Sequence, residues 1–144
     1  MSPHKLPLPK VIRTGHEHSR AVEYAALPEL LPQVLSWARS TNRLSTPTSK
    51  TLSTVLRALY LNAVHHAYGP VRLVLIEHPL NYVDLVVKDC GPIDGTSEPT
   101  LGADGGLATV ENLTDSWGWY GTPQGHTVWA RLSDNPQGQN GNNR

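Results

Sequence analysis

Two stretches of the chain carry apolar residues at helical spacing, one over residues 28–42 and one over residues 45–67. Pro28 suits the first turn of the first helix, where a missing N–H costs nothing. Pro32 has to lie in that first turn as well, or the helix starts later than Pro28. Gly69 and the proline after it end the second helix. The pattern therefore predicts two consecutive helices in the first half of the chain.

Four other stretches have the apolar content and spacing of β-strands. They are residues 21–27, with weak alternation, and residues 71–76, 83–88 and 127–132. A turn at residues 78–81 separates the second stretch from the third. We expect these two strands to pair as an antiparallel hairpin.

Gly, Pro, Ser, Thr and Asp dominate residues 91–106, which predicts a long loop of the kind that often forms a lid or a binding loop. Apolar residues at helical spacing from Leu107 onward mark a third helix, which is expected to end around Gly118. Trp117, Trp119 and Tyr120 lie beside the last strand and are expected in the core, although an aromatic patch would also suit a protein partner. Residues 121–125 form a turn that leads into the last strand.

Strands and helices are partly segregated along the chain, and a strict alternation of strand and helix is absent. This order favours an α+β fold, a two-layer α/β sandwich with helices on one face of a mixed, mostly antiparallel sheet. We expect residues 1–20 to form a loose N-terminal arm and residues 21–134 to form the folded domain. Residues 135–144 are rich in Gln, Asn and Gly and lack an apolar anchor, so a disordered tail is expected there.

Composition narrows the functional classes. The 144 residues include 12 Lys and Arg and 12 Asp and Glu, so no global field points to nucleic acid or to an acidic membrane surface. Cys90 is the single cysteine, which rules out an intramolecular disulfide. No apolar run approaches the roughly 20 residues that cross a bilayer, and residues 1–13 lack the apolar core of a secretory signal. We therefore expect a cytoplasmic protein that binds neither nucleic acid nor membrane.

Two polar residues border the expected core. Asn62 lies beside the buried stripe of the second helix, where its amide oxygen can coordinate Mg²⁺ together with phosphate oxygens, or can bond a neighbouring loop. Asp89 continues the core-facing side of the strand over residues 83–88, where a carboxylate needs a donor. The exocyclic amine of adenine would serve, and so would backbone N–H groups of the following turn.

Further candidates lie at element ends. The glycine pair that closes with Gly106 opens a helix, and free N–H groups at a helix start favour phosphate. Thr127 begins the last strand, where it can bond a base edge or act only as a strand former. His66 lies at a helix end, next to a phosphate or as a partner of the helix dipole. His16 and His18 resemble a metal-binding fragment, but no third ligand can be assigned.

Taken together, these features resemble the histidine-kinase-like ATPase superfamily, also called GHKL, and within it the anti-sigma-factor serine-protein-kinase branch common in actinobacteria. The segments that carry the resemblance are residues 62–67, 87–92, 106–110 with 115–118, and 125–129. The resemblance implies that ATP and Mg²⁺ are the cofactors, with Asn62 holding Mg²⁺, Asp89 binding the adenine amine and the helix start at Gly106 binding phosphate. His66, Gly91, Leu107 and Thr127 complete the implied nucleotide site.

Three positions depart from the family pattern. Ala58 stands where the family has a glutamate, one helical turn before Asn62, and it can neither accept a proton nor orient a nucleophile. Asp104 and Ile93 replace glycines of the nucleotide-binding loops. We therefore expect a kinase-like protein of little or no catalytic activity.

The function implied by the resemblance is that of an ATP-binding regulator that binds a sigma factor, an anti-anti-sigma-like protein or another transcription regulator. A homodimer is an open alternative, and so is an inactive pseudokinase-type binding module that does not need ATP.

Overall fold

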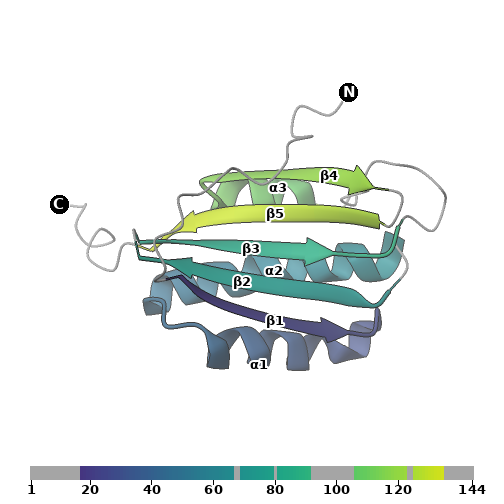
Figure 1. The fold of residues 1–144 in the computed structure, drawn as a ribbon, viewed down its shortest axis with the longest axis horizontal. Helices are drawn as coiled ribbons and strands as arrows, with labels where there is room; N and C mark the ends of the chain where they lie inside the picture. Colours follow the sequence, from purple (N-terminus) through teal and green to yellow (C-terminus); the bar gives the residue numbers. More distant parts are fainter. Residues whose placement is uncertain (1–16, 67–68, 80, 92–105, 123–124, 135–144) are drawn as a thin grey trace.

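Five strands form one antiparallel sheet in the computed structural model, which describes residues 17–66, 69–79, 81–91, 106–122 and 125–134 (Figure 1). The strands are β1 (His18–Tyr24), β2 (Val71–His78), β3 (Tyr82–Lys88), β4 (Ser116–Thr122) and β5 (Gly125–Ser133). Their order in the sheet is β1-β2-β3-β5-β4, and all four pairings are antiparallel. The hairpin expected between the second and third strands is confirmed as β2 and β3.

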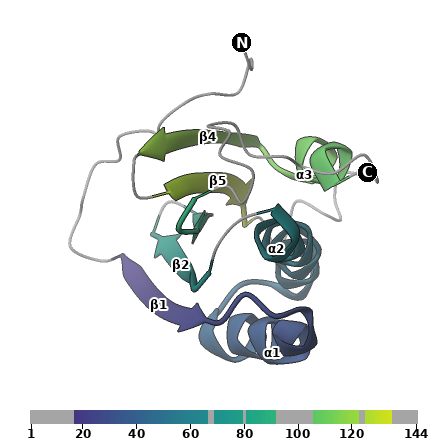
Figure 2. The same cartoon turned by 90° about the vertical axis from the view of Figure 1, so that its right-hand side faces the viewer.

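The helices cover a single face of this sheet (Figure 2). They are the short 3₁₀ helix η1 (Pro28–Leu30) and the α-helices α1 (Leu31–Thr41), α2 (Thr46–His66) and α3 (Gly106–Leu113). The molecule is therefore an α+β fold, a two-layer α/β sandwich, as the order of sequence patterns predicts. The α-helical part of the first helix begins at Leu31, so Pro32 lies in its first turn as the sequence requires.

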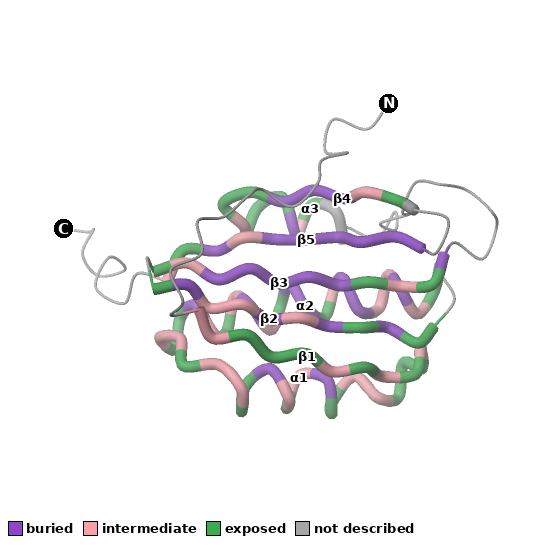
Figure 3. The backbone as a smooth tube through the Cα atoms, in the orientation of Figure 1, coloured by how far each residue is buried: buried purple, intermediate pink, exposed green. Residues whose placement is uncertain are grey.

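The core lies between α2 and the helix-facing side of the sheet, and Figure 3 shows its buried residues. Side chains of α2 at helical spacing meet those of the central strands at alternate positions. The fully buried members include Leu52, Val55 and Leu56 of α2, Leu73 and Leu75 of β2, Val83 and Leu85 of β3, and Ala130 of β5. Because alternate residues point to opposite faces of the sheet, each strand has a helix-facing side and an outer side.

The first strand starts earlier than expected, at His18 rather than at residue 21, and it ends at Tyr24. Pairing with residues 71–77 of β2 determines these bounds, because His18 is in register with Glu77 and Tyr24 with Val71. The expected tail, residues 135–144, lies outside the described residues, and so do residues 1–16 of the arm expected over residues 1–20. Residues 92–105 of the loop expected over residues 91–106 also lie outside them.

The strand β4 was not predicted. The third helix ends at Leu113, not around Gly118, and the chain then pairs with β5 as the edge strand β4. Glycines within β4 lower its apparent strand propensity, but Trp117 and Trp119 show the two-residue period. Both indoles are buried in the core, as expected.

The outer side of the sheet carries a buried ionic cluster that sequence reasoning also missed. Asp84 of β3 is fully buried and accepts from Arg131 of β5 at 2.7 Å and 2.9 Å. Nε2 of His78 in β2 lies 3.0 Å from the second oxygen of the same carboxylate. The Tyr82 ring stacks on His78 and lies 4.4 Å under the Arg131 guanidinium. This cluster ties β2, β3 and β5 together, and the hydrogen bonds that Arg131 donates to Asp84 raise the pKa of Arg131.

Candidate functional site

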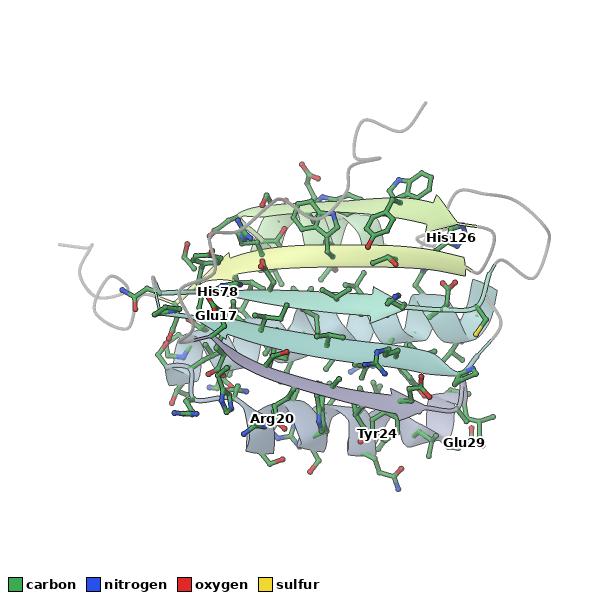
Figure 4. All side chains as sticks on the ribbon, in the orientation of Figure 1. Glu17, Arg20, Tyr24, Glu29, His78 and His126 are labelled. Carbon is green, nitrogen blue, oxygen red and sulfur yellow. The ribbon has the colours of Figure 1, made fainter. Side chains whose placement is uncertain are left out.

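The candidate nucleotide-binding residues gather at one end of the sandwich. After α2 ends at His66, the chain enters β2 at Val71, and the start of β2 pairs with the end of β3. The end of β3 in turn pairs with the start of β5. This topology brings the last turns of α2, with Asn62, to the same end of the sheet as Asp89. His126, near the start of β5, marks this end in Figure 4, and His78 marks the opposite end.

Asp89 is held rigidly just after β3. Its Oδ1 accepts the backbone N–H of Gly91 at 2.8 Å and that of His126 at 2.9 Å. Its own backbone N–H donates to the carbonyl of His126 at 3.0 Å. Among the described residues, no donor lies within hydrogen-bonding distance of Oδ2. The two interpretations of Asp89 are therefore compatible: one oxygen fixes the turn, and the other remains available to a donor such as an exocyclic amine.

Two glycines allow the backbone to approach Asp89 closely enough for these hydrogen bonds. Gly125 has φ +148°, and a Cβ at that position would lie 2.0 Å from the carbonyl oxygen of Asp89. Gly91 has φ +124°, in the region that favours glycine, but a Cβ there would meet no described residue closer than 4.0 Å. Gly91 therefore meets a backbone requirement, and Gly125 meets both a backbone and a spatial requirement.

Asn62 presents an unsatisfied polar atom. Its Oδ1 is buried and has no hydrogen-bond partner among the described residues. Leaving a buried acceptor without a partner costs about 1–3 kcal/mol, so such an atom calls for an explanation. A cation held by the amide oxygen would satisfy it, which fits the Mg²⁺ role that the family resemblance implies. Ala58, one turn earlier on α2, is half-buried against the core and offers no carboxylate.

The structure describes the other residues of the implied nucleotide site to different extents. Gly106 is the first residue of α3, so the expected helix start is present at the expected position. His66 is the last residue of α2 and Leu107 the second of α3, and their side chains lie outside what the structure describes. The metal fragment proposed at His16 and His18 is only half described, and the ring of His18 lies 2.9 Å from an Arg43 nitrogen.

The structure places Thr127 on the other side of the sheet from the Asp89 side chain. Thr127 is in register with Lys88, and the next residue, Val128, packs in the helix-facing core. Because side chains alternate along a strand, Thr127 faces outward, and His126 faces the site in its place.

His126 is the residue of this site that sequence reasoning missed. Its Nδ1 lies 3.8 Å from Oδ1 of Asp89, and its buried ring meets Trp119 edge to face at 6.0 Å. The alternate apolar residues of β5 show which side of the strand faces the helices, and this pattern would have placed His126 on that side.

Within the described part of the chain, no helix combines the length and apolarity of a membrane span. No protein-family model matches the chain, and no curated protein matches it in sequence. Among solved structures, it is similar to the RsbU and RsbW domains of Rv1364c from Mycobacterium tuberculosis. The TM-score is 0.65 at 15% identity, and the match covers 80% of this chain and 32% of that chain. This chain thus spans about a third of the solved chain, and the likeness at this identity concerns the fold. The chain therefore shares the fold of these domains, which in this chain is a two-layer α/β sandwich.

Proposed function

We propose that this chain is an ATP-binding regulatory domain that acts by binding another regulatory protein. The observation that carries the proposal is the buried Oδ1 of Asn62, which has no partner in the described part of the chain and lies at the same end of the sheet as the hydrogen-bonded Asp89. A cation ligand and a fixed acceptor are the two groups that bind opposite ends of a magnesium nucleotide. The fold and the order of the family-like segments support the same assignment.

Each residue has a defined role in this proposal. Asn62 would hold Mg²⁺, which neutralises phosphate charge when bound. Oδ2 of Asp89 would accept the adenine amine, because the backbone N–H groups of Gly91 and His126 already occupy Oδ1. The N–H groups at the start of α3, from Gly106, would bind phosphate oxygens.

Binding, rather than phosphoryl transfer, is the proposed activity. A kinase needs a group that accepts the proton of the attacking hydroxyl, and Ala58 cannot supply it. The family resemblance suggests a sigma factor, an anti-anti-sigma-like protein or another transcription regulator as the partner, with a homodimer as a further proposal. In this arrangement, nucleotide binding would change partner affinity by favouring one conformation of the binding site.

Calorimetry with Mg-ATP tests the nucleotide proposal. We expect binding by the unmodified protein and its loss in Asp89→Asn, which keeps the Oδ1 acceptor but replaces Oδ2 with a donor. Asn62→Ala should weaken binding in the presence of Mg²⁺, whereas Asn112→Ala, an exposed change on α3, should have no effect.

Absence of binding at millimolar ATP would mean that the binding free energy is weaker than about 4 kcal/mol. That result would remove the nucleotide and favour the second candidate function, a pseudokinase-type module that binds its partner without ATP.

A further inference from the structure

The outer side of the sheet, opposite the helices, is buried along its central strands. We call this surface the outer strip and define it by His78, Asp84, Val86, Thr127 and Trp129. Trp129 is 2% exposed and Val86 is 7% exposed, although the described helices all lie on the opposite face. The outward residues of the edge strand β1 are exposed instead, as the tube in Figure 3 shows.

The strand neighbours of Trp129 cannot by themselves bury its ring. Across the sheet it lies between Val86 of β3 and Gly118 of β4, and a glycine has no side chain to pack against it. An indole standing on an open sheet face would be largely exposed to solvent. The outer strip therefore needs a cover from elsewhere.

We propose that residues 1–16 of this same chain dock on the outer strip and form its cover. This segment contains Leu6, Leu8, Val11 and Ile12, which can bury apolar surface against Val86 and Trp129. By contrast, residues 135–144 contain no aliphatic or aromatic side chain. Residues 92–105 contain only Ile93 and Leu101 as large apolar residues and are joined at both ends to the candidate nucleotide site.

Length and attachment point fit the proposal. The segment joins the described chain at Glu17, immediately before β1, and His18 is in register with Glu77 beside His78. Sixteen extended residues reach about 50 Å, whereas crossing the five strands needs only about 19 Å. Three prolines, at positions 3, 7 and 9, favour an extended backbone that needs no ladder hydrogen bonds. Such a backbone suits a sheet face, which offers apolar side chains and no free backbone groups.

Residue-resolved hydroxyl-radical footprinting of the full chain tests the cover. In the double variant Leu8→Asp, Ile12→Asp, we expect Trp129 to lose its protection from oxidation. Trp117, buried on the helix side of the sheet, should keep its protection. The matched control Ser2→Asp, Thr14→Asp adds the same charge without removing apolar side chains, and Trp129 should stay protected in it. Unchanged protection of Trp129 in the apolar double variant would overturn the proposal.

A photo-crosslinking residue at position 8 of the otherwise unmodified chain gives a second measurement that does not depend on how the variants fold. Cross-links to β3 or β5 of the same chain are expected. Cross-links to a second copy would assign the outer strip to a dimer interface instead. Cross-links to the helices, or none within the chain, would equally refute docking of residues 1–16. None of these results depends on nucleotide binding, so they test the cover independently of the proposed function.

Discussion

At the residue scale, Asp84 is the buried charge that connects three strands. Its carboxylate has Arg131 on one side and His78 on the other, so Asp84→Asn removes the charge between them and replaces one of the two acceptor oxygens with a donor. We expect Asp84→Asn to lower the free energy of unfolding by about 3 kcal/mol, measured by urea denaturation. The exposed pair Glu23–Arg72, at 3.8 Å, provides the control. Glu23→Gln should cost less than about 1 kcal/mol, and an equal loss in both variants would contradict the structural role of Asp84.

Tyr60 makes the stability of the fold depend on pH in the alkaline range. Its hydroxyl lies 2.7 Å from the carbonyl oxygen of Ala25 and 2.9 Å from that of Leu27, so it anchors the segment after β1 to α2. Burial raises the pKa of Tyr60 above its ordinary value of 10.0, and the carboxylate of Glu29 adds to the rise. The folded state therefore holds this proton more tightly than the unfolded state does. The resulting stability is fully present below about pH 10 and is lost as the pH rises through the folded pKa.

The variant Tyr60→Phe isolates this contribution. At neutral pH we expect it to be about 1 kcal/mol less stable, because the carbonyl oxygens of Ala25 and Leu27 lose their hydrogen-bond donor. The difference between the two proteins should shrink as urea midpoints are followed from about pH 8 to about pH 11. A difference that stays constant over this range would show that the phenol does not titrate with unfolding.

At the scale of elements, the junction of β3 and β5 depends on Gly125. Gly125→Ala introduces both a positive φ and a contact of 2.0 Å with the carbonyl oxygen of Asp89. Gly91→Ala introduces only the positive φ, which costs about 1–3 kcal/mol. We expect Gly125→Ala to cost more than about 4 kcal/mol in chemical denaturation. Equal costs would mean that the start of β5 can move away from Asp89 freely.

How far the elements could be predicted follows from the range of the interactions. The helices α1 and α2 and the β2–β3 hairpin depend on local periods and turns, and the sequence predicts them. The strand β4 has its signal in Trp117 and Trp119, but its glycines obscure that signal, and only pairing with β5 makes it a strand. The cluster around Asp84 joins three different strands, so no local pattern contains it.

The candidate site shows the same division. Asn62 and Asp89 follow from the edge of a helical stripe and the end of a strand, which are local patterns. Whether His126 or Thr127 faces the site depends on which alternate residues of β5 point toward the helices. A shift of one residue along the strand moves a side chain to the other face of the sheet.

At the scale of the whole molecule, helix α2 carries the proposed Mg²⁺ ligand Asn62 but has Ala58 at the position of the catalytic base. Nucleotide binding and catalysis are therefore expected to be separable. We expect the unmodified protein to show no measurable ATPase or kinase turnover, since Ala58 occupies the position of the base. Ala58→Glu should raise turnover, by up to about 10²–10⁴-fold if the rest of the site is competent. The control Thr54→Glu adds a carboxylate at an exposed position one turn farther from Asn62 and should have no effect. Rapid phosphorylation of a partner by the unmodified protein would show that another group acts as the base.

The strand order also has a consequence for biosynthesis. The last strand of the chain, β5, is inserted between β3 and β4. Until residue 133 has left the ribosome, β3 has an open edge, and β4 has no strand to pair with. The sheet therefore cannot be completed beyond β1, β2 and β3 until β5 is available, and the nascent chain presents an unpaired edge to neighbouring chains. Premature termination within β5 would yield a chain whose strand β4 cannot join the rest of the sheet, a form suited to chaperone binding or degradation rather than to partial function.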